Sequence, residues 1–325
     1  MTDYPTMQQQ CRLEPFDAVR WQARLLLEKR RRWLTSSQTK LDKFDGVNVG
    51  LTLSPAREAL PYLLGVDRAA LRRMREDLTV GKPGLADWIR RTGDFTPRGV
   101  GLNVSPKWTA CPRATAACSF ACVGKGGQGR LQSSQIARIG RTLAYHMAPA
   151  LAVEQIAIEV AKKTGRRGKE RTVWLRANVA TDGPERAASI LATARALGFQ
   201  VRGIDPARIR AYDYTAIPEA LERRDGVTRC LSYKGTKRSE RECREALAAG
   251  HRVAVVFDIG KDDPKPATWH GHTVRDGDQH DVWPLFTGPG EVVGLYLKGM
   301  PDEKARARRS GFAVHPSDPS TRVSP

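Results

Sequence analysis

Short apolar runs alternate with amphipathic stretches from about residue 99 onward. Runs rich in valine, leucine and aromatic residues predict strands, and apolar positions recurring every three to four residues predict helices. The predicted strands are 99–106, 171–179, 208–215, 228–234, 252–258 and 292–298, with a shorter one before Asp276. The predicted helices are 132–163, 184–198, 217–224 and 239–250. This alternation predicts an α/β fold built as a parallel (β/α) barrel or barrel-like sheet, with a doubly wound open sheet as the alternative.

The first 96 residues have a different pattern. They contain no run rich in β-branched residues, and FDAVRWQARLLLEKRRRWL places apolar residues on one helical face and basic residues on the rest. We therefore expect a helical, basic N-terminal region over residues 1–96. Residues 97–314 would form the barrel-like domain, which contains a cysteine segment around Cys111, Cys118 and Cys122. The proline- and serine-rich end, residues 315–325, has the composition of a disordered tail.

Charge narrows the class of partner. The chain has 54 Lys and Arg against 35 Asp and Glu, a net charge of +19. Such an excess attracts polyanions, of which nucleic acid is the usual one, although an arginine-rich composition would also follow from a GC-rich genome. No apolar run approaches the roughly 20 residues of a membrane helix, and no signal peptide is visible at the N-terminus. We expect a cytoplasmic protein that binds nucleic acid, DNA rather than RNA, and no membrane.

Candidate nucleic-acid contacts fall in the basic N-terminal stretch, in the glycine-rich basic turn 124–130 with the helix after it, and at strand ends. The glycine-rich turn would hold a phosphate at a helix N-terminus, or it is a flexible turn. Tyrosines at a strand end would stack on an extruded base. The candidates are Arg30, Arg31, Arg32, Lys125, Arg130, Arg138, Arg141, Tyr212, Tyr214 and Lys298.

Three cysteines, Cys111, Cys118 and Cys122, follow the first predicted barrel strand with the spacing C-x6-C-x3-C. In a reducing compartment such a cluster points to metal before disulfides, and three thiolates suit zinc or an iron–sulfur cluster with one open position. The arrangement resembles radical-SAM enzymes in kind, which would make S-adenosylmethionine a cofactor, but their spacing is C-x3-C-x2-C. Buried structural thiols, and redox or nucleophilic cysteines, are the alternatives.

Polar residues gather where the predicted strands end. Asn178 and Asp182 follow one strand and Asp213 lies near the end of the next. Parallel strands bring their carboxyl ends to one edge, where α/β enzymes place their active sites. We expect one aspartate to act as general base or nucleophile, the other as acid or orienting group, and Asn178 to bind a carbonyl edge. The predicted function is base modification of nucleic acid by a metalloenzyme, of which base exchange as in the tRNA-guanine transglycosylases is one version.

Two other functions remain open. The turn VRDGDQHD brings Asp276, Asp278 and Asp281 within six residues, which would hold Mg²⁺ in a nuclease or phosphodiesterase, or form a solvated acidic turn. Without any catalytic site, the chain would be a basic accessory protein that binds nucleic acid through phosphate contacts.

The blocks GLNVSP, CPRATAACSFACVGKGGQGR, QSSQIARIGRT, WLRANVATD, YDYT, LSYKGTKRSE, VAVVFD, VRDGDQHD and GLYLKG occur in this order. Together they resemble an uncharacterised protein family carried by bacteriophages and plasmids, over residues 99–314. The resemblance implies a mobile-element origin and brings no activity with it. The chain departs from the family pattern at Val179, where a glycine is usual, and at Ala216, where a lysine is usual.

Overall fold

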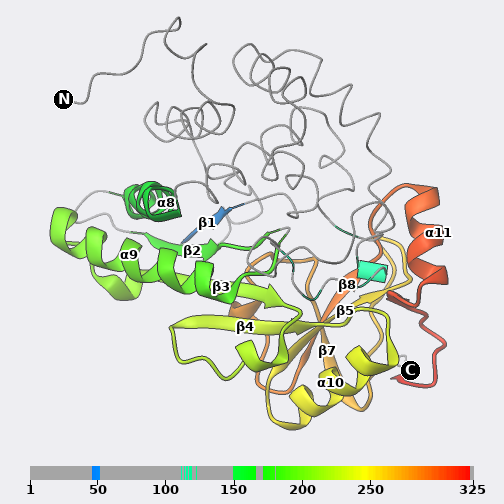
Figure 1. The fold of residues 1–325 in the computed structure, drawn as a ribbon. Coiled ribbons are helices and arrows are strands. Elements are labelled where there is room, and N and C mark those ends of the chain that lie inside the picture. Colours follow the sequence, from blue (N-terminus) through cyan, green and yellow to red (C-terminus); the bar gives the residue numbers. More distant parts are fainter. Residues whose placement is uncertain are drawn as a thin grey trace, which may run out of the picture.

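The computed structural model describes residues 46–51, 149–165, 171–179 and 181–322, together with Cys111, Arg113, Thr115, Ala117, Cys118 and Cys122 of the cysteine segment. These residues form a mixed α/β fold around one largely parallel sheet (Figure 1). The predicted strand 99–106 and the first part of the predicted helix 132–163 lie outside the described residues. The other long predicted strands and two of the helices are present, shifted by a few residues at their ends.

The sheet has the strand order β1-β2-β3-β4-β5-β8-β7-β6-β10, and β9 pairs beside β5. Pairing is parallel from β1 to β8 and between β8 and β7, and antiparallel from β7 through β6 to β10. The strand bounds are β1 Gly46–Gly50, β2 Thr172–Arg176, β3 Ile209–Thr215, β4 Val227–Ser232, β5 Arg252–Phe257, β6 Thr268–Trp269, β7 His272–Asp276, β8 Val292–Tyr296, β9 Ala313–Val314 and β10 Thr321–Arg322. Among the described strands the sheet stays open between β1 and β10, so a closed barrel is not confirmed.

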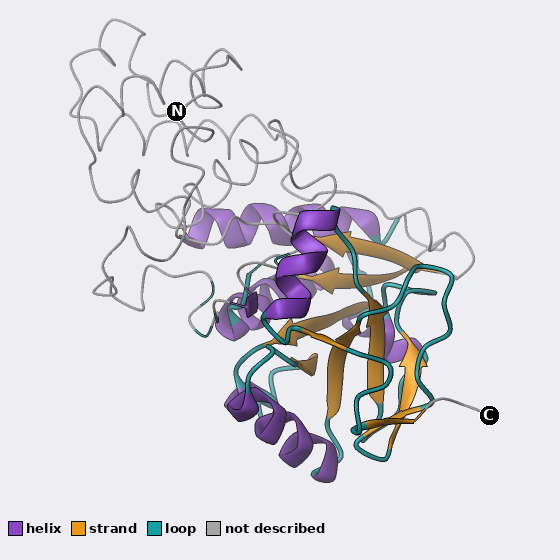
Figure 2. Ribbon diagram, turned by 90° about the vertical axis from the view of Figure 1, so that its right-hand side faces the viewer, coloured by secondary structure: helices purple, strands orange, loops and turns teal. Residues whose placement is uncertain are grey.

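Three helices cover one face of this sheet. They are α8 (Pro149–Lys163), α9 (Pro184–Arg202) and α10 (Lys237–Ala248). Helices α8 and α9 pack on β1, β2 and β3, and α10 packs on β4 and β5. The strand registers place the residues under α9 and those under α10 on the same face of the sheet. Ala211 and Thr215 lie four residues apart on β3 and therefore point to one face, and Thr215 pairs with Leu231 of β4. A doubly wound sheet carries helices on both faces, and here the β2–β3 and β4–β5 connections share one face. Figure 2 shows the strands side by side with helices outside them.

The opposite face is aromatic at its centre. Tyr212 packs edge-on against Trp174 and Trp283, with ring centroids 6.2 Å apart in both pairs. Trp283 belongs to a short 3-10 turn, η6 (Trp283–Leu285), that covers this part of the sheet. The tyrosine hydroxyl donates to Asn48 Oδ1 of β1, which satisfies a buried polar pair. Side chains of β2 and β3 therefore divide between an aliphatic face under α9 and an aromatic face under η6.

Three elements before residue 310 differ from the sequence prediction: β1, η5 and α11. Strand β1 lies in the region predicted to be helical, where Val47 and Val49 pair with Val173 and Leu175 of β2. The strand has five residues and begins and ends with glycine, so its alternation of apolar and polar residues is too short to be recognised. Only the 3-10 turn η5 (Pro218–Ala220) occupies the predicted helix 217–224. Helix α11 (Pro301–Arg309) was not predicted.

Part of the C-terminal stretch 315–325 pairs with the sheet. Thr321 and Arg322 of β10 pair with Thr268 and Trp269 of β6, within the stretch predicted to be a disordered tail. Just before β10, Asp318 accepts hydrogen bonds from the backbone N–H and the hydroxyl of Ser320. These polar residues therefore form a turn that leads into the strand. No helix of the described residues is long and apolar enough to cross a membrane.

Candidate active site

The loop after β2 and the end of β3 bring the predicted catalytic residues together. Asn178, Asp182 and Asp213 are 3%, 8% and 2% exposed, so all three are buried polar groups. The loop is short because Gly183 caps α9 and Pro184 occupies its first turn, where the missing proline N–H costs nothing. The expectation that parallel strand ends gather these residues is confirmed.

Asn178 joins the two strands directly. Its amide nitrogen donates to Asp213 Oδ2 at 2.5 Å and to the carbonyl of Gly183 at 3.0 Å. Its amide oxygen accepts from Thr181 Oγ1 at 3.3 Å and from Arg186 at 2.6 Å. The side-chain amide has two donors and two lone pairs, and neighbours within the protein use all four. Asn178 therefore does not present a free edge to a base, as the sequence led us to expect; it orients Asp213.

Arg186 is a site residue that sequence reasoning missed. It lies in the first turn of α9, is 7% exposed, and its Nη1 donates to Asn178 Oδ1 and to Thr181 Oγ1 at 2.9 Å. A cation near a helix N-terminus opposes the helix dipole, so neighbouring acceptors and carboxylates must compensate. Its position in the first turn of a helix does not distinguish it from a surface arginine, so the sequence carries no signal of its burial.

Asp182 is anchored to the strand beside it. Its Oδ1 accepts from Thr215 Oγ1 at 2.9 Å and its Oδ2 accepts from the backbone N–H of Ala216 at 2.7 Å. Both donors belong to the end of β3, so Asp182 ties the β2–α9 loop to that strand. The pKa of Asp182 is raised by burial, against the hydrogen bonds from Ala216 and Thr215 that favour its charged form.

Asp213 has the more informative electrostatics. Burial raises its pKa to about 7, although Arg176, the Asn178 hydrogen bond and Arg186 all lower it, and the charge of Asp182 raises it further. A carboxyl group that titrates near neutrality can both donate and accept a proton under physiological conditions. Strongly perturbed carboxyl groups of this kind are concentrated at functional sites.

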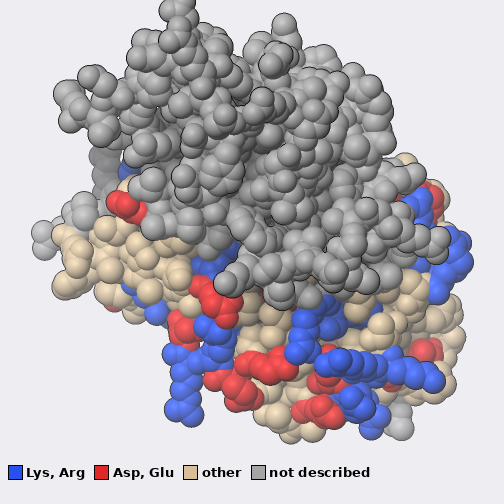
Figure 3. All heavy atoms as spheres, viewed as in Figure 1, with Lys and Arg blue, Asp and Glu red and all other residues tan. Residues whose placement is uncertain are grey.

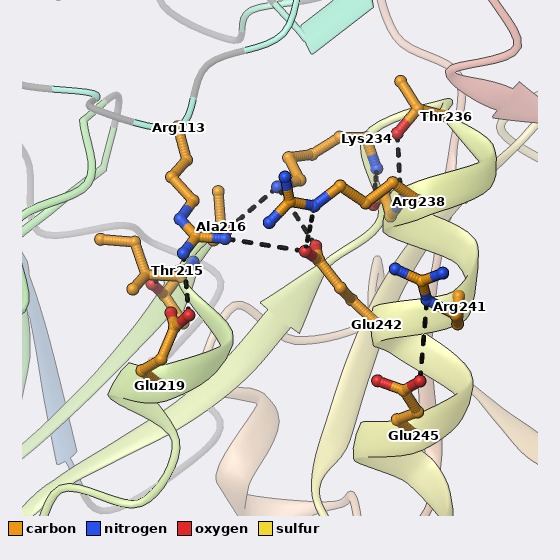
Figure 4. A network of polar contacts seen from close by, with 12 residues as sticks. Arg113, Thr215, Ala216, Glu219, Lys234, Thr236, Arg238, Arg241, Glu242 and Glu245 are labelled. Carbon is orange, nitrogen blue, oxygen red and sulfur yellow. Dashed lines mark hydrogen bonds and ion pairs between the residues drawn. The ribbon is translucent and has the colours of Figure 1, made fainter.

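The cysteine segment lies over the carboxyl ends of β3 and β4. Thr115 Oγ1 donates to the carbonyl of Lys234 at 3.2 Å and accepts from the backbone N–H of Cys118 at 3.1 Å. Arg113 pairs with Glu219 at 2.8 Å and with Glu242 at 3.6 Å (Figure 4). These contacts hold the segment against the strand ends.

The thiols share this environment with Asp182. Burial, then the neighbouring Cys122, raise the pKa of Cys118 to about 11. Burial is also the largest cause of a raised pKa for Cys111, followed by Cys122 and Asp182. The five cysteines of the described residues form no disulfide. The described part of the chain holds no group of three or more His, Cys, Asp or Glu side chains placed to bind a metal, so the ligand role of the cysteines stays a prediction.

Lys234 is a second buried cation beside the cysteine segment. It follows β4, is 5% exposed, and its Nζ donates to the carbonyl of Ala216 at 3.1 Å with Glu242 Oε2 at 3.7 Å. Ala216 thus donates its backbone N–H to Asp182 and accepts from Lys234 at its carbonyl, so its main chain contacts both charges. Lys234 lowers the pKa of Cys118, which places it beside the thiols.

The acidic turn after β7 is an ion-pair cluster. Lys265 Nζ lies 3.4 Å from Asp276 Oδ1 and 3.2 Å from Asp278 Oδ2, and Lys298 Nζ lies 2.9 Å from Asp278 Oδ1. The Lys265 side chain is only 7% exposed, so its ammonium takes the position that a cation would need. Asp281 stands apart, near Tyr212 and Tyr214; burial is the main cause of the raised pKa values of both tyrosines, and Asp281 adds to it. The geometry contradicts a magnesium site formed by these three aspartates.

The residues predicted to contact nucleic acid lie in different environments. Tyr212 is fully buried among tryptophans and cannot stack on a base, so that assignment is wrong. Tyr214 is half-buried, with the Arg176 guanidinium 4.5 Å from its ring centroid, and Lys298 is exposed but paired. On the face shown in Figure 3, basic and acidic side chains of the described residues are intermingled. The remaining candidates lie outside the described residues: Arg30, Arg31, Arg32, Lys125, Arg130, Arg138 and Arg141.

Comparison with known families places the chain. The family model described as gene product 88 matches residues 71–316 of the 325. The chain belongs to the gene product 88 family. This agrees with the phage-type family that the ordered sequence blocks resemble, and the match begins before residue 99, inside the predicted N-terminal region. Neither the curated proteins nor the solved structures contain a match to the chain.

Proposed function

We propose that this gene product 88 protein is a nucleic-acid-directed metalloenzyme that modifies a base, with its active site at the carboxyl ends of β2, β3 and β4. One observation carries the proposal: Asp213 is buried, its pKa is raised to about 7, and it lies in one polar cluster with Asp182 beside the cysteine segment. A buried carboxyl group with a raised pKa lowers the stability of the fold, and such costs are typically retained where a proton must be moved.

The two carboxyl groups have different roles. Asp213 is the acid–base group, because its titration near neutrality allows it to hold a proton in one step and release it in the next. Asp182 is held on both oxygens by the end of β3 and supplies negative charge beside the reacting centre. Two neighbouring carboxyl groups whose environments differ in this way divide acid–base chemistry between them.

Cys111, Cys118 and Cys122 would hold zinc or an iron–sulfur cluster. The support is the thiol donor set itself, its place beside Asp182, and thiols close enough to raise one another's pKa. When bound, zinc supplies a Lewis acid and a cluster supplies an electron or an open coordination position. A cluster would imply S-adenosylmethionine as co-reactant. A cation would also favour the thiolate forms, so binding would release protons.

Nucleic acid is the proposed substrate because of the charge of the whole chain, +19. An excess of this size favours association with a polyanion through phosphate contacts, and base chemistry would follow on an extruded or single-stranded base. A basic accessory protein shares the charge but has no use for two buried carboxyl groups at a strand edge. Their presence favours the enzyme.

Anaerobic purification followed by metal and sulfide analysis tests the metal part of this proposal. The expected result is bound zinc, or iron with sulfide, in the wild type and its loss in the Cys111→Ala/Cys118→Ala/Cys122→Ala variant. Cys243→Ala serves as a matched control, because Cys243 is a buried thiol of α10 with a raised pKa and lies outside the segment. A wild-type chain that binds neither metal, or a triple variant that keeps its metal, would overturn the ligand assignment.

A further inference from the structure

The orientation of the Asn178 amide is decided by a residue that cannot accept a hydrogen bond. Arg186 carries only donors, and its Nη1 lies 2.6 Å from one terminal atom of the amide. That atom must be the oxygen. The amide NH2 group is therefore turned the other way, toward Asp213 Oδ2 at 2.5 Å and the Gly183 carbonyl at 3.0 Å. Thr181 reinforces the choice, since it donates to the same amide oxygen and accepts from Arg186.

This orientation makes the two oxygens of Asp213 unequal. Oδ2 accepts the short hydrogen bond from Asn178, whereas Oδ1 accepts a longer one, 3.2 Å, from the backbone N–H of Tyr214. A proton placed on Oδ2 would weaken the stronger contact, and a proton placed on Oδ1 costs only the weaker one. With the amide reversed, its oxygen would face Oδ2, and the carboxyl group would have to keep a proton there.

We propose that Arg186 is a positioning residue that holds the Asn178 amide with its NH2 group toward Asp213 and so assigns the exchangeable proton of Asp213 to Oδ1. The inference rests on the acid–base role of Asp213 proposed above and adds which oxygen performs it. Arg186 acts through Asn178, which is why the side chain of α9 and the carboxyl group of β3 belong to one unit.

Other charged groups face Asp213 and must be separated from this effect. Arg176 of β2 and Arg186 lower the pKa of Asp213, and Asp182 raises it. Arg229 is the register partner of Asp213 on β4, but its guanidinium is paired with Asp225 at 2.7 Å. Removal of Arg186 therefore acts in two ways, by loss of its charge and by release of the amide, and both raise the pKa of Asp213.

A mutant cycle read by carbon-13 NMR separates the two. The aspartate Cγ signal that is absent in Asp213→Asn is followed from pH 4 to 9 in the full chain. Arg186→Met should raise the pKa of Asp213 by about 1 to 2 in the wild-type background. In the Asn178→Ala background the same change should have less than half that effect, because only the charge is then lost. Arg186→Lys, which keeps a charged donor, should restore most of the wild-type titration.

Arg195→Met is the control, since Arg195 also projects from α9 and donates to the Ile209 carbonyl of β3 at 2.9 Å, away from Asn178. It should leave the titration of Asp213 unchanged. Equal effects of Arg186→Met in both backgrounds would overturn the positioning role and leave charge alone. If Arg186→Met does not fold, the wild type provides the test. The NMR signals of the Asn178 side-chain NH2 group should then shift with pH as Asp213 titrates. Signals that do not shift would overturn the inference. Titration of Asp213 below about pH 5 would refute its acid–base role instead, whatever Arg186 does.

Discussion

Asn178 and Asp213, 35 residues apart in the chain, are joined by a hydrogen bond of 2.5 Å between the amide nitrogen and Oδ2. The bond links the loop after β2 to the neighbouring strand β3 on the face that α9 covers. It exists because parallel strands end at the same edge and because Arg186 turns the amide toward the carboxylate. The acid–base group of the proposed site is thus oriented by the same contacts that close the β2–α9 loop.

The raised pKa of Asp213 predicts a pH dependence of stability. Unfolded, the carboxyl group titrates near its usual value of 3.8, and in the fold near 7. Between these values the folded state binds more protons than the unfolded state, so the free energy of unfolding falls as pH rises from 3.8 to 7 and levels off above. The loss is on the order of 4 kcal/mol for a shift of about three pKa units.

Urea unfolding of the wild type and Asp213→Asn from pH 4 to 8 measures this. The variant should gain stability relative to the wild type across that range by a few kcal/mol. Asp205→Asn, at an exposed capping aspartate, should show no such trend. A stability difference between Asp213→Asn and the wild type that is constant with pH would mean that Asp213 is ionised throughout.

Glu242 is the second testable feature, because three cations meet at its carboxylate. Arg238 lies at 2.8 Å, Arg113 of the cysteine segment at 3.6 Å and the buried Lys234 at 3.7 Å. Glu242→Gln leaves Lys234 without its carboxylate, for which we expect a loss of about 3 kcal/mol in the free energy of unfolding, together with faster alkylation of Cys118.

The same helix provides the matched control for that change. Among the described residues, Glu245 forms an ion pair only with Arg241, at 3.7 Å (Figure 4), and both side chains are about 70% exposed. Glu245→Gln should change stability by less than about 0.5 kcal/mol and leave the alkylation rate unaltered. If both variants behave alike, Glu242 does not hold the cysteine segment in place.

Sequence patterns predicted the parallel strands and the gathering of Asn178, Asp182 and Asp213, because apolar runs of strand length and the meeting of parallel strand ends are local or general rules. They did not predict Arg186 or Lys234. Whether a cation is buried depends on acceptors from distant segments, such as the Ala216 carbonyl for Lys234.

Other misses have equally physical causes. Tyr212 stands next to Asp213, and alternation along a strand puts the two side chains on opposite faces, so the tyrosine belongs to the aromatic core and not to the site. The aspartates after β7 have metal-like spacing, but Lys265 folds back from another loop to neutralise them. Two-residue strands such as β9 and β10 leave no periodicity to read.

The lysine-neutralised turn makes its own prediction. Lys265→Met removes a buried ammonium from Asp278, whose side chain is 9% exposed, and should cost about 3 kcal/mol of stability. Lys298→Met, at a lysine that is 54% exposed and pairs with the same carboxylate, should cost less than about 1 kcal/mol. Millimolar Mg²⁺ should leave the melting temperature of the wild type unchanged in a thermal-denaturation scan. A Mg²⁺-dependent rise in that temperature would restore the metal-site reading of this turn.

Thr115 predicts how the position of Cys118 is controlled. Its hydroxyl bridges the Lys234 carbonyl and the Cys118 N–H, and valine has the same shape without either hydrogen bond. If the cysteines bind zinc or a cluster, Thr115→Val should weaken metal binding by about tenfold, as loss of an orienting contact outside the ligand set typically does. Thr115→Ser should retain wild-type affinity in a competition with a chelator. Equal affinity of the valine and serine variants would show that this hydroxyl has no role in positioning the ligand.

Base modification itself is tested most directly by mass analysis of nucleosides. DNA and RNA from cells that produce the wild type, Asp213→Asn or Asp205→Asn are digested to nucleosides and compared. We expect a nucleoside of altered mass with the wild type and with Asp205→Asn, and its absence with Asp213→Asn. Binding of the purified proteins to an oligonucleotide should be the same for all three. Identical nucleosides in all three samples, with binding intact, would contradict the enzyme and leave a protein that binds nucleic acid without changing it.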